Sequence, residues 1–178
     1  MKLHKTVAMI GMMGAGKTAV GTAVARLLNV PFIDSDDEIV KAANRSIAEI
    51  FERDGEAFFR AKEAKVIARL LSGPPVILST GGGAYTMAEN RAEISERGVA
   101  LWLKADLETL WQRVRHKNTR PLLRTPNPRA TLAEIMEKRD PIYALADLSV
   151  ESGPGVMIDE MAQRVLTVLA TRPDVLES

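Results

Sequence analysis

The stretch VAMIGMMGAGKTAVGTAVARLL, Val7 to Leu28, decides the fold. It begins as a continuous apolar run, passes through a glycine-rich loop, and continues with apolar residues spaced along one helical face. This order predicts a buried strand, a loop, and a helix that begins near Lys17. The segment from Gly11 to Thr18 also fits the pattern G-x-x-x-x-G-K-[ST], which binds phosphate when a strand precedes it and a helix follows it.

The chemistry of this loop follows from its residue types. Glycines let the backbone N–H groups turn toward phosphate oxygens, and the positive end of the following helix adds to the attraction. Lys17 is expected to neutralise the β- and γ-phosphates, and the Thr18 hydroxyl to bind Mg²⁺ directly. A glycine-rich turn without function is the alternative, but the strand–loop–helix context argues against it. The residues expected to bind ATP here are Gly14, Ala15, Gly16, Lys17, Thr18 and Ala19.

Composition narrows the class of protein. A chain of 178 residues, with 46% hydrophobic and 26% charged residues, is typical of one soluble globular domain. The net charge of +1 gives no general attraction to nucleic acid or to a membrane. The chain has no cysteine, which excludes disulfides and thiolate chemistry and fits a cytoplasmic protein. No apolar run approaches the ~20 residues of a membrane helix. We expect a single domain over residues 1–178, cytoplasmic and monomeric, without nucleic-acid or membrane partners.

Strands and helices alternate along the whole chain. The pattern therefore predicts an α/β fold with a parallel sheet, in which the functional loops gather at the carboxyl ends of the strands. Further strands are predicted at VPFIDSD, PPVILST, VALWLKA and DLSV. Further helices are predicted from the capping boxes Ser46/Glu49 and Thr131/Glu134, over 56–71 after a break at RDG, over 89–97, from Asp106 to 114, and over 156–170.

Two acids follow the second predicted strand, in FIDSDDEI. Residues two apart in an extended segment share a face, so Asp34 and Asp36 are expected to look toward the phosphate loop together. The third strand ends without an acid, which leaves Asp34 to organise the water around Mg²⁺. Asp36 is then free to accept a hydrogen bond, and a proton, from a substrate hydroxyl. A solvated acidic loop is the alternative.

A triple glycine and two arginines are further candidates. Gly81, Gly82 and Gly83 follow a strand directly, where they bring the backbone close to a ligand; a merely flexible loop is the alternative. Arg60 and Arg139 would clamp a carboxylate if they converged, because the guanidinium fork matches that group. Each is otherwise a surface arginine, and sequence spacing does not show that the two converge.

The segment Thr109–Ala133 contains six basic residues and no acid. Nucleic-acid binding is one reading, but with 4% aromatic residues the chain has few stacking platforms. A lid that closes on nucleotide phosphates fits better, with Arg120 stabilising the transferring group. The chain lacks the N-K-x-D guanine reader of common GTPases and has little room for a motor's extra elements. A small-molecule kinase is therefore favoured.

The motifs GMMGAGKT, DSD, GEAFFR, GGGA, RPLL and RDPIY, in that order, resemble the shikimate kinase family over about Val7 to Leu169. The resemblance implies a P-loop kinase-type three-layer fold, with a five-stranded parallel sheet, helices on both faces, a lid at about 115–128 and a substrate-binding helical region at about 36–63. It also implies Mg²⁺-dependent transfer of the ATP γ-phosphoryl group to the 3-hydroxyl of shikimate, in aromatic amino-acid synthesis. Gluconate kinase is the nearest alternative, but it does not naturally explain DSD, GGG and RDPIY together.

The resemblance also implies roles for single residues. Arg60 and Arg139 would bind the shikimate carboxylate, and Arg113 would stack on adenine. Pro154 would lie in the adenine-side loop, a weaker match. The implied substrate-binding residues are Asp36, Arg60, Gly81, Gly82, Gly83 and Arg139. The implied catalytic residues are Lys17, Asp36 and Arg120, with Thr18 on the metal directly and Asp34 through water.

Overall fold

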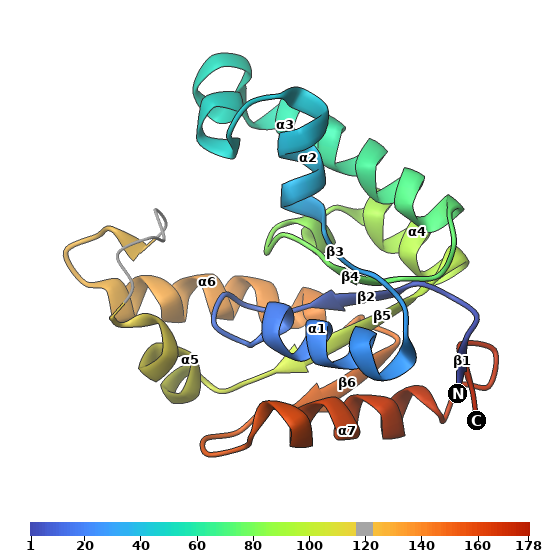
Figure 1. The fold of residues 1–178 in the computed structure, drawn as a ribbon. Coiled ribbons are helices and arrows are strands. Elements are labelled where there is room, and N and C mark those ends of the chain that lie inside the picture. The colour runs from blue at the N-terminus through green and yellow to red at the C-terminus, as the bar shows by residue number, and fades with distance from the viewer. Residues whose placement is uncertain (117–122) are drawn as a thin grey trace.

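The computed structural model describes residues 1–116 and 123–178, and its frame is a five-stranded parallel sheet (Figure 1). The central strand is fully buried, as its continuous apolar sequence predicts. Its first residue, Val7, lies opposite Ile77 on one neighbour and Val99 on the other. In spatial order the strands are β3 (Phe32–Asp34), β4 (Ile77–Ser79), β2 (Val7–Ile10), β5 (Val99–Lys104) and β6 (Leu148–Glu151).

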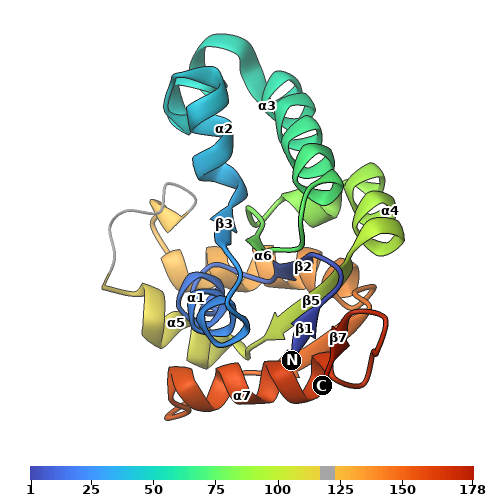
Figure 2. The same cartoon turned by 45° about the vertical axis from the view of Figure 1, so that its right-hand side comes forward.

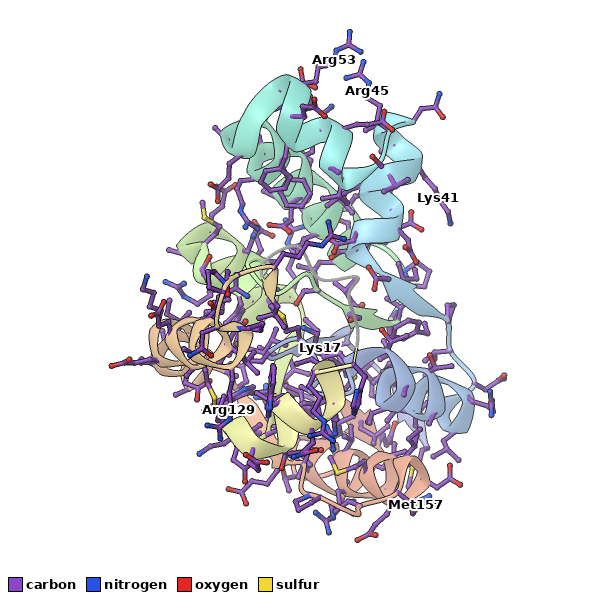
Figure 3. The ribbon with its side chains drawn as sticks, turned by 90° about the vertical axis from the view of Figure 1, so that its left-hand side faces the viewer. Lys17, Lys41, Arg45, Arg53, Arg129 and Met157 are labelled. Atoms are coloured by element: carbon purple, nitrogen blue, oxygen red, sulfur yellow. The ribbon has the colours of Figure 1, made fainter. Side chains whose placement is uncertain are left out.

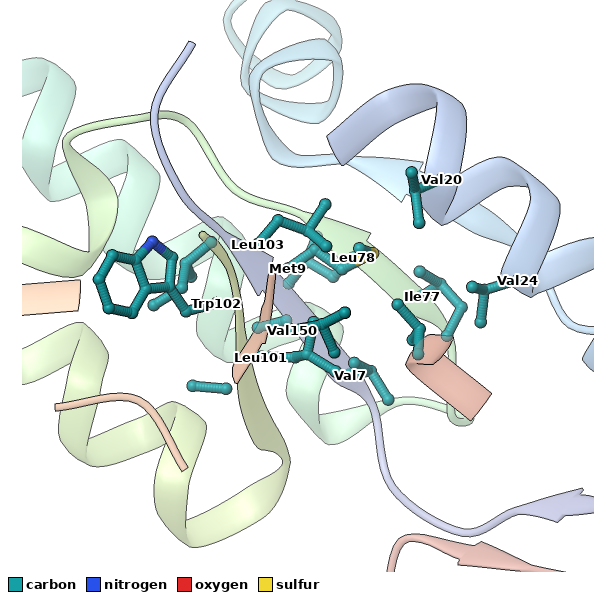
Figure 4. Packing of buried hydrophobic residues seen from close by; sticks show 14 of the residues in the cluster. Val7, Met9, Val20, Val24, Ile77, Leu78, Leu101, Trp102, Leu103 and Val150 are labelled. Carbon is teal, nitrogen blue, oxygen red and sulfur yellow. The ribbon is translucent and has the colours of Figure 1, made fainter. Parts of the chain in front are cut away.

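Helices cover both faces of the sheet, which gives the predicted three layers (Figures 1 and 2). On one face α1 and α7 pack together, and Val20 and Val24 of α1 point toward Ile77 and Leu78 (Figure 4). On the other face α4 packs against β5, and α6 against the short 3₁₀ helix η1. The bounds are α1 (Lys17–Leu28), η1 (Ala84–Thr86), α4 (Ala88–Arg97), α5 (Leu107–Val114), α6 (Pro128–Tyr143) and α7 (Ile158–Leu169).

Helices α2 (Ser35–Ala43) and α3 (Ile47–Ser72) extend beyond the sheet (Figures 1 and 2). They share a small core of their own, made by Ile39, Ile50, Phe59 and Val66. The break predicted at RDG is present as a kink at Gly55, where φ is 85°. Ser46 caps α3 by accepting from the Glu49 N–H at 3.1 Å, as predicted. The residue pattern alone did not predict helix α2, although most of it lies within the helical region at about 36–63 that the resemblance implies.

One other prediction about local structure is wrong, and one small sheet was not predicted. The capping box at Thr131 and Glu134 is wrong, because α6 already begins at Pro128. The Asn127 side chain accepts from the Ala130 N–H at 3.2 Å, and proline suits the first turn, where its missing N–H has no helical partner. The sequence also gave no sign of β1 (Lys2–Leu3) and β7 (Leu176–Glu177), which pair antiparallel.

Within residues 1–116 and 123–178, no helix combines the length and the apolar character needed to cross a lipid bilayer.

Candidate active site

A pocket of about 760 Å³ opens at the carboxyl ends of the central strands. It brings together parts of the chain that are far apart in sequence: the phosphate loop, the start of α2, the middle of α3, the triple glycine, and arginines from α5 and α6. This is where ligands bind in open parallel sheets. The lining residues that carry the argument are Lys17, Asp36, Arg60, Glu63, Gly82 and Arg139.

The phosphate loop has the backbone that its glycines predicted. Gly14 and Gly16 have φ values of 83° and 97°, in the left-handed region that favours glycine. Gly16 is the N-cap of α1 and gives it no side-chain cap, so the first N–H groups of the helix face the loop. The Lys17 ammonium donates to the Gly11 carbonyl at 2.5 Å and lines the pocket below α2 and α3 (Figure 3).

The two predicted acids both line the pocket, but the predicted reason is wrong. The extended segment ends at Asp34, and α2 begins at Ser35. Asp34 is the N-cap of α2, and its Oδ1 accepts from the N–H groups of Asp36 at 2.8 Å and of Asp37 at 3.4 Å. Asp36 therefore reaches the pocket from the first turn of a helix rather than from the face of a strand.

Burial makes both carboxyl groups harder to ionise. It raises the pKa of Asp34, against the effect of the hydrogen bond from the Asp36 N–H. Burial and the nearby Asp34 carboxylate also raise the pKa of Asp36, against the charges of Lys17 and Arg60. The Asp36 Oδ1 atom is buried and has no hydrogen-bond partner among the described residues. A buried acceptor of this kind is suited to receive a hydroxyl from a ligand.

Arg60 is paired with a buried glutamate that the sequence analysis did not single out. Its Nη1 donates to Glu63 Oε1 at 2.8 Å, and the Glu63 side chain is 1% exposed. Burial raises the pKa of Glu63, while the hydrogen bond and the charge of Arg60 lower it. The available signal was the spacing of three residues on one helix, which places the two side chains side by side.

The triple glycine supports three of the predicted substrate-binding side chains, one on each residue. A Cβ atom at Gly81 would lie 2.9 Å from Asp36 Oδ1, and one at Gly82 would lie 2.7 Å from Arg139 Nη1. A Cβ at Gly83 would overlap the Arg60 guanidinium, 2.9 Å from its Cζ. None of the three glycines has a φ in the left-handed region. Glycine is therefore required here by lack of space, not by backbone conformation.

This packing also shows that Arg60 and Arg139 converge, which the sequence spacing could not show. Arg60 on α3 and Arg139 on α6 lie against adjacent residues of one loop and line one pocket. Two guanidinium groups in this arrangement suit a carboxylate ligand.

Three residues outside the phosphate loop were predicted to contact ATP: Arg113, Arg120 and Pro154. The structure describes Arg113 and Pro154. Arg113 lines the pocket and donates to the carbonyls of Gly14 at 3.1 Å and Ala15 at 3.2 Å, and to the Ser152 hydroxyl at 3.0 Å. It therefore ties the phosphate loop to the loop after β6. Pro154 is exposed in that loop. Arg120 lies outside the described residues.

Aromatic and hydroxyl side chains complete the lining, and the sequence analysis missed them. Phe51 and Phe59 face each other with ring centroids 4.7 Å apart, and both border the pocket. Ser79 and Thr80 join β4 to the triple glycine and also border it. The only hint in the sequence was that Phe59 directly precedes Arg60.

The residues present fit a bound Mg²⁺. The Thr18 hydroxyl and the Asp34 carboxylate both border the pocket beside the phosphate loop. Mg²⁺ in nucleotide sites keeps several waters and takes few protein ligands besides phosphate oxygens. The described residues accordingly contain no group of three or more acidic, histidine or cysteine side chains arranged around a metal.

Comparisons with known proteins point to one family. The family model described as Shikimate kinase matches residues 13–170. The shikimate kinase of Cereibacter sphaeroides is 68% identical over 177 residues, covering 99% of this chain and 88% of that protein. The shikimate kinase of Ruegeria pomeroyi is 65% identical over 175 residues, covering 98% and 90%.

Solved structures agree as well. The Acinetobacter baumannii shikimate kinase in complex with shikimate matches with a TM-score of 0.86 and 38% identity, covering 94% of this chain and 93% of that one. A gluconokinase from Sinorhizobium meliloti, with a TM-score of 0.65 and 21% identity, shares the fold. The family model and the close relatives both span nearly the whole chain, and on these findings the chain belongs to the shikimate kinase family.

Proposed function

We propose that this chain transfers the γ-phosphoryl group of ATP to the 3-hydroxyl of shikimate, giving shikimate 3-phosphate and ADP. As a member of the shikimate kinase family it is an ATP-dependent kinase. The observation that carries the choice of acceptor is the packing of Asp36, Arg139 and Arg60 on three consecutive glycines. This packing would provide a general base and a carboxylate clamp on one surface, beside the phosphate loop.

Binding would be organised by the two arginines. The guanidinium groups of Arg60 and Arg139 hold the carboxylate of shikimate, and the ring lies along Gly81–Gly83. Fixing the acceptor in this way places one hydroxyl near Asp36 and near the terminal phosphate, which lowers the entropic cost of the reaction. The region 36–63 is then the substrate-binding part of a single domain over 1–178, and about 115–128 is its lid.

The transfer itself needs charge stabilisation and one proton acceptor. The shikimate oxygen forms a bond to the γ-phosphorus as the bond to the β-phosphate oxygen breaks, and ADP leaves. Asp36 takes the hydroxyl proton, since burial raises its pKa and makes it a stronger base. Lys17 and, from the lid, Arg120 stabilise the charge on the phosphates.

Mg²⁺ belongs to this proposal, held by the Thr18 hydroxyl directly and by Asp34 through water. When bound, it neutralises phosphate charge and orients the phosphate chain. Arg113 stacks on the adenine, and Pro154 lies in the loop on the adenine side. We further propose that the enzyme is monomeric and cytoplasmic and binds neither nucleic acid nor membranes.

The test is an assay of ADP release with MgATP and, separately, shikimate, quinate and gluconate as acceptors. We expect release that depends on shikimate alone. Release with gluconate and not with shikimate would leave the fold and the phosphate loop in place but would overturn the carboxylate clamp and the role of the triple glycine.

A further inference from the structure

Tyr143 is a buried tyrosine on the edge of the proposed carboxylate site. It is the last residue of α6 and lies one helical turn after Arg139, so the two side chains share a face. The residue is fully buried, and its ring lies 6.1 Å from that of Trp102, centroid to centroid. Packing alone therefore explains a large aromatic side chain here, but it does not explain a hydroxyl group.

The hydroxyl contacts the site. It donates to the Gly82 carbonyl at 2.6 Å, across 61 positions of sequence. Burial raises the pKa of Tyr143, while the charge of Arg139 and a hydrogen bond with its side chain lower it. The hydroxyl thus joins the middle residue of the triple glycine to one arm of the predicted clamp. A buried phenol needs such partners, and these two both belong to the site.

There is little free space around Gly82, where the Arg139 guanidinium and the Tyr143 hydroxyl both lie close to the backbone. A Cβ there would lie 2.7 Å from Arg139 Nη1 and 4.0 Å from the Tyr143 hydroxyl oxygen. The guanidinium and the phenol oxygen therefore both lie close to the Gly82 backbone. Release of the hydroxyl would let the Gly82 peptide rotate and the guanidinium settle elsewhere.

We propose that Tyr143 is a positioning residue for the acceptor's carboxylate, whose hydroxyl fixes the Gly82 peptide and the Arg139 guanidinium relative to each other. This inference rests on the proposed function and deepens it. Tyr143 is not expected to touch shikimate or to take part in phosphoryl transfer.

The experiment compares wild type with Tyr143→Phe, which keeps the ring and removes the hydroxyl. We expect the KM for shikimate to rise roughly 5- to 20-fold, less than the full loss of a hydrogen bond to a charged group, because the Arg139 guanidinium is displaced rather than removed; kcat and the KM for ATP should change less than about twofold. Tyr85→Phe is the matched control, because Tyr85 is also buried, but the charged and polar side chains that affect the pKa of its hydroxyl are Asp147, Arg91 and Ser95, none of which lines the pocket. This control should leave the KM for shikimate unchanged.

Two further arms separate positioning from a structural role. An analogue that carries a hydroxymethyl group in place of the carboxylate should bind both proteins equally, because it makes no ion pair with Arg139. In an Arg139→Ala background, Tyr143→Phe should add nothing to the loss of shikimate affinity.

Several outcomes would overturn the proposal: an unchanged shikimate KM in Tyr143→Phe, an equal loss with the hydroxymethyl analogue, a comparable rise in the KM for ATP, or additive losses with Arg139→Ala. A Tyr143→Phe protein that fails to fold would assign the hydroxyl to the fold instead and would also overturn it. A wild-type protein that does not turn over shikimate would contradict the proposed function itself, and this inference with it.

Discussion

Adding one methyl group at Gly83 should disable acceptor binding without unfolding the protein. Gly83 has φ −94° and ψ −9°, a conformation open to alanine, so Gly83→Ala carries no backbone strain. Restricting the unfolded chain even favours alanine, by about 0.4–1 kcal/mol. The new Cβ, however, would lie 2.9 Å from both Cζ and Nη1 of Arg60, and nearer still to Nη2.

The size of the effect follows from that contact. Atoms of this kind rest about 3.5–4.0 Å apart, so the guanidinium must retreat by roughly 1 Å. A charged hydrogen bond contributes about 1.5–3 kcal/mol. Since about 1.4 kcal/mol corresponds to a tenfold change in affinity, losing the contact from Arg60 to the carboxylate should raise the KM for shikimate roughly 10- to 150-fold. The KM for ATP should not change, because the phosphate loop is untouched.

The assay is ADP release at saturating MgATP over a range of shikimate concentrations, with the melting temperature measured in parallel. Two other glycines supply controls. A Cβ at Gly73 would make only an ordinary contact, 3.6 Å from the Leu70 carbonyl, so Gly73→Ala should be neutral. A Cβ at Gly98 would lie 2.6 Å from the Thr6 carbonyl, which is backbone and cannot move cheaply. Gly98→Ala should lower the melting temperature and leave the shikimate KM unchanged.

Two results would refute this role of Gly83: a shikimate KM of Gly83→Ala within twofold of wild type, or a loss of thermal stability as large as that of Gly98→Ala. The first result would remove Arg60 from acceptor binding. The second would mean that the glycine serves the fold.

The remaining predictions concern charged groups of the same pocket. Asp36→Asn should cut kcat at least about a hundredfold in the ADP-release assay, and near-normal turnover would remove Asp36 from the mechanism. The same variant should be more stable than wild type at pH 7 but not at pH 3. Burial raises the pKa of Asp36 above its usual 3.8. The free energy of unfolding of the wild-type protein therefore decreases as the pH rises and this carboxyl ionises. An equal difference in melting temperature at both pH values would contradict this. Lys17→Ala should also cut kcat at least about a hundredfold with the melting temperature unchanged, and activity close to wild type would refute its role on the phosphates. Arg60→Ala should raise the KM for shikimate and spare the KM for ATP; a loss of ATP affinity instead would show that Arg60 is misplaced in this account.

The central strand and the helix after the phosphate loop could be predicted from the sequence, because the residue patterns that define them are local. A fully apolar run before a glycine loop has few interpretations other than a buried strand, and β2 and α1 lie where the pattern places them. The break at Gly55 and the cap at Asp106, whose Oδ1 accepts from the Thr109 N–H at 2.7 Å, are equally local.

Helix α2 shows where local signals mislead. Its first turn holds Asp36, Asp37 and Glu38, which resemble a solvated acidic loop when read alone. Acids near a helix N-terminus are in fact favoured by its positive end, and Asp34 supplies the cap. Both acids line the pocket, but the residue pattern did not show the helix that carries Asp36.

The convergence of Arg60 and Arg139 could not be predicted from their spacing in the sequence, for a different reason. One arginine lies on α3 and the other on α6, and only the tertiary fold brings both to the triple glycine. The buried partner Glu63 and the buried Tyr143 left only weak signals, a spacing of three or four residues from each arginine on the same helix.

The central claim is that three consecutive glycines seat the acceptor-binding groups, and a crystal structure of the protein with shikimate tests it most directly. We expect the carboxylate to lie within hydrogen-bond distance, about 2.7–3.2 Å, of the guanidinium groups of both Arg60 and Arg139. We also expect the ring to lie along Gly81–Gly83 with a hydroxyl at Asp36. Shikimate bound with its carboxylate away from either arginine, or outside this pocket, would contradict the account.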